Sequence, residues 1–265
     1  MKRMIIETGI SKNAEGGFDF NFKTDNRDTD ILFLNEDVSK IETDGDIDIV
    51  YAYKYNEKAN RDDIKAFRQT LKLQLSDVET LYSDEVFNFV ENGIFRIDRY
   101  FSLDDFNVLI GIQSTSESKA LTDIMTDILE HEMKEIEHSF TLIKRMYECI
   151  TIDCDKMYTV LEEAGYDERI ESIIDKAMRK FEALKSQGQL YQSKKFFPKI
   201  ITEAFSDYLI FENDKQRELY EKLQGANVLF CDDFYTSGST LREANRYLKS
   251  INPDNQITAF ILIKQ

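Results

Sequence analysis

The sequence lacks tryptophan, and its 265 residues include only two prolines, two histidines and three cysteines. Three cysteines are an odd number and too few for a disulfide framework, so we expect a reducing, cytoplasmic compartment. Charges interrupt every apolar run longer than a strand, which predicts that no helix crosses a membrane. The first ten residues, MKRMIIETGI, lack the continuous apolar core of a signal peptide.

Several familiar binding motifs are missing as well. The chain contains neither GxGxxG nor GxxxxGK[ST], which argues against a dinucleotide oxidoreductase or a P-loop ATPase. Its histidines, His131 and His138, and the nearby Cys149 and Cys154 do not follow a recognised zinc-ligand spacing. We therefore expect no metal site built by protein side chains alone.

Acidic residues outnumber basic ones by 50 to 34, which gives a formal net charge of −16. Such a surface repels phosphate backbones, so we expect no nucleic-acid partner. A small anionic ligand is still compatible with this charge, because a few backbone amides and a metal ion can reverse the local potential in a pocket.

Hydrophobic patterning divides the chain into a β-rich segment, residues 1–58, and an α/β domain, residues 59–265. Strict alternation in FDFNFK (18–23) and IDIVYAYKY (47–55) predicts strands in the first segment. From residue 61 onward, apolar residues recur every three or four positions, which predicts a helical region that ends at Asn92-Gly93.

The α/β domain alternates strand-like and helical patterns. Nearly continuous apolar runs predict buried strands over 106–112, 140–147, 228–231 and 257–263. Strands of this kind, separated by helices, indicate a parallel sheet with helices on both faces. Residues 155–222 have mostly helical spacing, and we interpret them as a helical insertion.

The most informative stretch is VLFCDDFYTSGST, residues 228–240, in which an apolar strand ends in two carboxylates and a hydroxyl-rich turn. A turn that opens a helix presents free backbone amides, which suit a phosphate group. The turn residues that we assign to such a phosphate are Thr236, Ser237, Gly238, Ser239 and Thr240.

Asp232 and Asp233 need a different ligand group, because carboxylates repel phosphate. Carboxylates accept hydrogen bonds from vicinal hydroxyl groups and help to place a divalent cation. A phosphate beside hydroxyl groups and a magnesium ion describes a phosphorylated sugar.

This stretch resembles the signature of type I phosphoribosyltransferases: four apolar residues, two acidic, two variable, then Thr, Thr or Ser, Gly, any residue, and Thr or Ser. The resemblance implies a parallel α/β core, Mg²⁺ as cofactor and phosphoribosyl pyrophosphate (PRPP) as substrate. It also implies that Asp232 and Asp233 contact the ribose hydroxyls and that residues 236–240 bind the 5′-phosphate.

A weaker resemblance concerns FNVLIGIQSTSESKAL, residues 106–121, which is similar to the strand and pyrophosphate-binding loop of the same family. It implies a pyrophosphate-binding role for Gln113, Ser114, Thr115 and Ser116, although an ordinary helix cap is the alternative. Lys144 and Arg145 could neutralise pyrophosphate, or they could belong to a solvated basic face.

Three functions stay open at this point. One is an enzyme that transfers the phosphoribosyl group to a nitrogen nucleophile, with a nucleobase as the expected acceptor. The second is an inactive PRPP- or nucleotide-sensing regulator on the same fold, because a fold does not fix a function. The third is a phosphohydrolase that acts on a sugar phosphate. The resemblance allows a homodimer, which no feature of the sequence establishes.

Overall fold

The structure is a computed structural model that describes residues 9–12, 18–21, 30–34, 42–56, 58–76, 84–98, 101–113, 121–235 and 237–264. The strands of its large sheet are β1 (Gly9–Lys12), β2 (Phe18–Asn21), β3 (Asp30–Leu34), β4 (Glu42–Asp44), β5 (Ile47–Tyr55), β6 (Val108–Ile112), β7 (His138–Lys144), β10 (Leu209–Phe211), β11 (Asn227–Tyr235) and β12 (Gln256–Lys264). Their spatial order is β10-β7-β6-β11-β12-β5-β3-β1-β2, and β4 also pairs with β5.

The centre of the sheet is parallel, as the sequence predicted. Strands β7, β6, β11, β12 and β5 run in the same direction. Antiparallel β10 borders β7 at one edge, and antiparallel β3 and β4 pair with β5 at the other. Because β5 pairs with β12, part of the N-terminal β-rich segment belongs to the central sheet.

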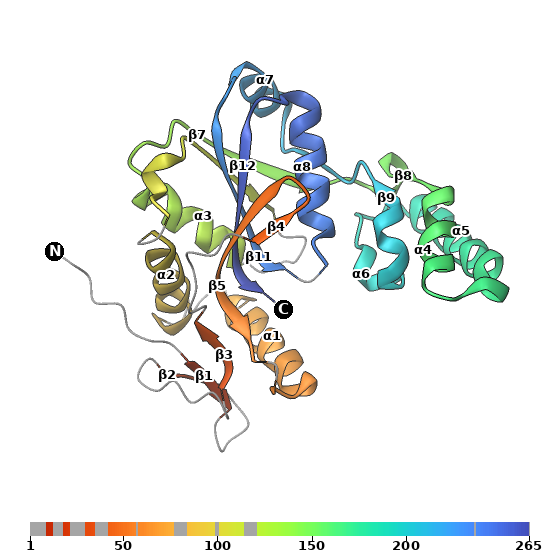
Figure 1. Cartoon of the computed structure of the whole chain (residues 1–265), viewed down its shortest axis with the longest axis horizontal. Helices are drawn as coiled ribbons and strands as arrows, with labels where there is room; N and C mark the ends of the chain where they lie inside the picture. The colour runs from red at the N-terminus through yellow and green to blue at the C-terminus, as the bar shows by residue number, and fades with distance from the viewer. Residues whose placement is uncertain are drawn as a thin grey trace.

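Helices cover both faces of this sheet (Figure 1). On one face, α1 (Arg61–Ser76), α2 (Asp84–Asp98) and α3 (Leu121–Glu132) contribute to one hydrophobic cluster. On the other, α7 (Asp214–Lys222) and α8 (Ser239–Ile251) contribute to a second cluster. Most strand residues feed the two clusters alternately, as the two-residue period of a strand predicts, with Ala52 and Tyr53 of β5 and Leu262 and Ile263 of β12 as exceptions. The α/β fold class is therefore confirmed.

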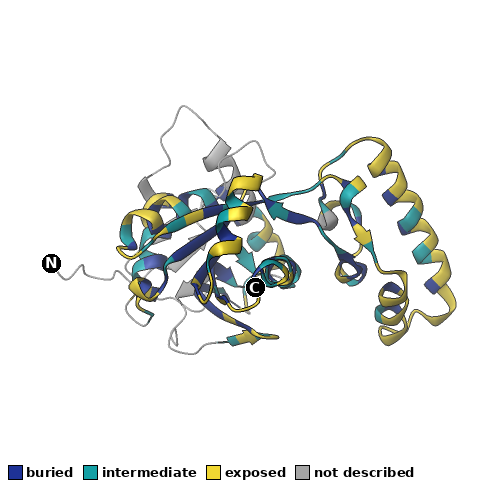
Figure 2. Ribbon diagram, turned by 90° about the horizontal axis from the view of Figure 1, so that it is seen from above, coloured by how far each residue is buried: buried dark blue, intermediate teal, exposed yellow. Residues whose placement is uncertain are grey.

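A helical unit projects from one side of the sheet between β7 and β10 (Figures 1 and 2). Its elements are η2 (Tyr147–Cys149), β8 (Thr151–Ile152), α4 (Cys154–Glu163), η3 (Asp167–Arg169), α5 (Ile170–Ser186), α6 (Ser193–Phe196), η4 (Lys199–Ala204) and β9 (Phe205–Ser206). We call residues 146–207 the insertion; these bounds differ from the predicted 155–222, because β10 belongs to the large sheet and α7 packs on it. Its aromatic side chains pack on one another: the rings of Tyr147 and Phe181 lie 5.4 Å apart, and those of Phe197 and Phe205 lie 4.9 Å apart.

One predicted boundary is wrong: α2 does not end at Asn92-Gly93 but continues to Asp98. Gly93 is buried against the sheet, where a Cβ atom would lie 2.9 Å from the Tyr53 ring and 3.0 Å from the Cβ of Ala52. Gly93 therefore allows the helix to approach β5 closely, and tertiary packing outweighs the poor helix propensity of glycine.

None of the described helices is long and apolar enough to cross a membrane. This agrees with the absence of long apolar runs in the sequence.

Candidate functional site

The site predicted from the sequence lies where the sheet changes its winding direction. Strands β6 and β11 are parallel neighbours, and Gly111 pairs with Cys231 near their carboxyl ends. From β6 the chain passes through α3 to β7 on one side, and from β11 it passes through α8 to β12 on the other. In open α/β sheets, ligands bind in the crevice beyond the strands at such a point.

Asp232 and Asp233 lie on β11, which extends to Tyr235, four residues past the predicted strand end at Cys231. Both side chains are partly exposed, and the Asp233 amide donates to Oδ1 of Asp232 at 3.0 Å. Regular alternation is lost at this pair, because Cys231 and Phe234 both pack with the same hydrophobic cluster. The register with β12 nevertheless continues without an extra residue, from Asp232 opposite Ile261 to Tyr235 opposite Lys264.

Cys231 is poorly suited to nucleophilic chemistry. Its side chain is fully buried, and burial raises the pKa of its thiol far above the ordinary value, with a smaller contribution from the adjacent Asp232. The thiolate form is therefore inaccessible at neutral pH.

The turn after β11 leads directly into the N-terminus of α8. Gly238 has φ of 70°, in the left-handed region that glycine adopts without strain, and α8 starts at Ser239 without a side-chain cap. The first amides of α8 therefore have no partner within the helix. The hydroxyls of Ser237 and Ser239 lie 3.1 Å apart, and Thr240 is in the first helical turn. Thr236 lies outside the described residues.

Arg242 holds this turn in place, a role that the sequence analysis missed. Its guanidinium donates to the backbone carbonyl of Ser237 at 2.7 Å, to Oδ2 of Asp44 at 2.7 Å and to Oε1 of Glu203 at 2.8 Å. The hydroxyl of Tyr235 also donates to Asp44, at 3.1 Å. One arginine thus ties the turn to β4 and to the insertion. In the sequence, only its position two residues after the motif indicated that Arg242 could contact the turn.

Glu243 and Arg246, in the next turn of α8, bind the residues that connect the insertion to the sheet. Arg246 donates to both carboxylate oxygens of Glu243, at 2.8 and 2.9 Å, and to Asp207 at 2.6 Å. Glu243 in turn accepts from the Tyr208 amide at 3.1 Å, and the Tyr208 hydroxyl donates to the Ser239 carbonyl at 2.7 Å. Burial raises the pKa of Tyr208 far above its ordinary value, so this hydroxyl keeps its proton.

The remaining predicted residues have different positions. Gln113 directly follows β6 and is exposed. Its backbone N–H donates to the backbone carbonyl of Leu142 at 2.8 Å. Ser114, Thr115 and Ser116 lie outside the described residues. Lys144 ends β7 and pairs with Leu209.

Arg145 contacts residues 207 and 208, where the chain returns from the insertion to the sheet. It donates through Nη1 to the Asp207 carbonyl at 3.4 Å and through its amide to the Tyr208 carbonyl at 3.0 Å. These contacts give Arg145 a structural role beside whatever it contributes to the site.

In the described part of the chain, no three His, Cys, Asp or Glu side chains gather as a metal site. Magnesium, however, usually keeps several waters and binds through one or two carboxylates together with substrate phosphates. The partly exposed Asp232 and Asp233 fit that mode of binding.

Comparison with known proteins gives no further guide to this site. No protein-family model matches the chain, and no curated protein matches it.

Proposed function

We propose that the protein is a magnesium-dependent phosphoribosyltransferase that uses PRPP. The proposal is supported above all by one observation: the acidic pair and the glycine turn of β11 lie beside the carboxyl end of β6, at the winding switch of the sheet. Strands β6 and β11, which lead into the two segments that resemble the family's pyrophosphate and PRPP loops, are therefore neighbours, although more than a hundred residues separate them in sequence.

Each group at this edge of the sheet has a proposed role. The free amides of the first α8 turn, with the Ser237, Ser239 and Thr240 hydroxyls, bind the 5′-phosphate. Asp232 and Asp233 accept hydrogen bonds from the ribose hydroxyls. Gln113 and the segment that follows it bind the pyrophosphate. Bound Mg²⁺ would neutralise charge on the departing pyrophosphate.

The reaction requires no side-chain nucleophile. The bond between the anomeric carbon and the pyrophosphate oxygen breaks, a bond from that carbon to the acceptor nitrogen forms, and the nitrogen loses a proton. Positive charge develops on the ribose ring in the transition state, and the carboxylates beside it stabilise that charge. The protein's main contribution is to hold both reactants in line.

Calorimetric titration with PRPP and Mg²⁺, compared with ribose 5-phosphate and with pyrophosphate, tests the proposal. We expect PRPP to bind more tightly than either fragment. The double variant Asp232→Asn/Asp233→Asn should weaken PRPP binding at least tenfold, about 1.4 kcal/mol. Asp62→Asn/Asp63→Asn, an adjacent acidic pair in the first turn of α1, is the matched control for the change in net charge.

A screen of nitrogen acceptors for pyrophosphate release then separates an enzyme from a sensor. Release with one acceptor supports transfer, and tight PRPP binding without release with any acceptor supports a regulator. The proposed PRPP site is wrong if PRPP does not bind. It is also wrong if both double variants bind PRPP as tightly as the original chain does.

A further inference from the structure

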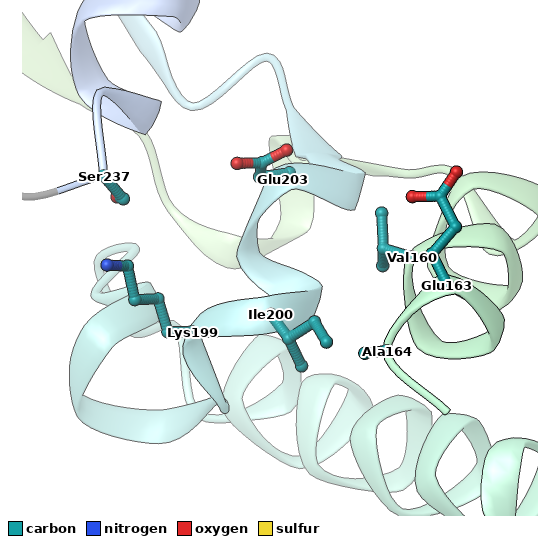
Figure 3. Close-up of a pocket in the computed structure, with 7 residues that line it drawn as sticks. All are labelled: Val160, Glu163, Ala164, Lys199, Ile200, Glu203 and Ser237. Carbon is teal, nitrogen blue, oxygen red and sulfur yellow. The ribbon is translucent and has the colours of Figure 1, made fainter. Parts of the chain in front are cut away.

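A groove separates the insertion from the turn after β11 (Figure 3). Its walls come from α4, from η4 and from Ser237, and its volume is about 510 Å³. Binding sites for small molecules commonly have about 300 to 1,000 Å³. The groove therefore has the size of a small-molecule site, next to the proposed phosphate turn but built mainly by the insertion.

The groove has an aliphatic lining, made by Val160, Ala164 and Ile200, with no aromatic side chain among the residues that line it. Val160 and Ala164 lie on the α4 side and Ile200 lies on η4, as Figure 3 shows. This lining offers van der Waals contact to an aliphatic chain and no stacking surface for an aromatic ring.

Two opposite charges stand at different ends of this lining. In Figure 3, the Lys199 amine points toward Ser237, whereas Glu163 lies across the groove at the end of α4. Within the part of the chain that the structure describes, neither side chain has an ion-pair or hydrogen-bond partner. A third charged residue, Glu203, binds Arg242 at 2.8 Å and shares this arginine with Asp44.

We propose that this groove binds a zwitterionic small molecule with an aliphatic middle. Its anionic group contacts Lys199 and the Ser237 hydroxyl, its chain packs on Val160, Ala164 and Ile200, and its ammonium group contacts Glu163. Charge-assisted hydrogen bonds at both ends are stronger than neutral ones. A ligand with one charge can form only one of these two contacts.

The inference goes beyond the proposed phosphoribosyl transfer, because it depends on the groove's own side chains and not on PRPP. Ser237 belongs to both the groove and the turn, so an occupant of the groove touches the proposed phosphate site. The two ideas can be tested separately, since groove binding is measured without PRPP.

The test uses straight-chain ω-amino acids, from β-alanine to ε-aminocaproate, as zwitterionic probes of increasing length. Caproate and hexylamine, which carry only one of the two charges, are the matched probes. Saturation-transfer NMR gives their relative affinities for the full chain. We expect at least one ω-amino acid to bind about tenfold more tightly than either singly charged probe, a difference of about 1.4 kcal/mol.

Three variants locate the binding. Glu163→Gln should lower the affinity of the ω-amino acid about tenfold without changing that of caproate. Lys199→Ala should weaken the binding of both the ω-amino acid and caproate, because each carries a carboxylate. Lys176→Ala, an exposed lysine of α5 outside the groove, should have no effect. Glu163 and Lys199 are exposed, so folding should be preserved, which circular dichroism checks.

The inference is wrong if no ω-amino acid binds, or if the zwitterions bind no better than caproate and hexylamine. It is also wrong if neither Glu163→Gln nor Lys199→Ala changes the binding. None of these results bears on PRPP titration, whose own failure would count against the proposed transferase and leave the groove intact.

Discussion

At the scale of single residues, Asp207 combines an unusual backbone with a shifted ionisation. Its φ of 63° is the one positive value among the described non-glycine residues, and aspartate is one of the few side chains that tolerate it. The hydrogen bond from Thr151 is the main cause that lowers the pKa of Asp207, with Arg246 adding to it and partial burial opposing it. The carboxylate therefore holds β8 and α8 together at the exit of the insertion.

This pKa shift predicts how stability depends on pH. A carboxyl group whose pKa is lower in the folded chain stabilises that chain above its unfolded pKa of about 3.9, and the contribution disappears as the pH falls through the folded pKa. Thr151→Val should raise the folded pKa of Asp207 and cost at most about 1 kcal/mol at neutral pH. The cost should vanish in acid, as denaturant unfolding at several pH values would measure.

Thr159→Val is the matched control, because its hydroxyl donates to the backbone carbonyl of Asp155 and not to a titrating group. Its effect on the free energy of unfolding should not depend on pH. Equal pH profiles for the two variants would contradict the assigned role of Thr151.

At the scale of elements, α8 connects three parts of the fold through its first two turns. Arg242 joins the turn at Ser237 to β4 and η4, and Arg246 joins Glu243 to the end of the insertion. A loop that is fixed before its ligand arrives loses less conformational entropy on binding. We therefore regard Arg242 as a positioning residue for the turn.

Arg242→Met tests this role. It should lower the free energy of unfolding by about 1 to 2 kcal/mol, because it removes hydrogen bonds to two carboxylates at a partly exposed site. It should also weaken PRPP binding about tenfold in the calorimetric titration. Arg179→Met, which removes an exposed pair with Asp175 inside α5, should change neither quantity. Unchanged PRPP affinity in Arg242→Met would show that the turn holds its shape without the arginine.

The elements of the central sheet could be predicted because buried parallel strands have nearly continuous apolar runs, as β6 and β12 do. The end of β11 could not be predicted in this way. The apolar run stops at Cys231, while backbone pairing with β12 continues from Asp232 to Tyr235. The motif predicted roles for Asp232, Ser237 and Gly238 from local pattern alone.

The contacts that position this motif could not be predicted from a local sequence pattern. Arg242 reaches Asp44 across 198 residues and Glu203 across 39, and only the folded sheet brings these side chains together. The continuation of α2 through Gly93 has the same origin, since it depends on the side chains of Tyr53 and Ala52 on another element.

At the scale of the whole molecule, the insertion is attached to the sheet without being part of it. Its strands β8 and β9 pair with each other in a separate two-stranded sheet. The cluster formed by α1, α2 and α3 on one face of the large sheet contains no insertion residue, whereas the cluster on the other face continues into the insertion and includes Tyr147 and Phe205. At the joint, Lys144 pairs with Leu209 and the Arg145 amide bonds to the Tyr208 carbonyl, so the chain leaves and returns at adjacent positions.

This geometry predicts that the sheet folds without the insertion. Replacing residues 146–207 by Asn-Gly, a pair suited to two-residue hairpins, should join β7 directly to β10. The shortened chain should lose helical circular dichroism yet unfold cooperatively in denaturant, with a smaller slope because less surface becomes exposed. It should also lose the binding of ω-amino acids, since α4 and η4 are gone. A shortened chain that aggregates or unfolds without a cooperative transition would mean that the packing of Tyr191 on Tyr208, whose ring centroids lie 4.5 Å apart, makes the insertion and the sheet one folding unit.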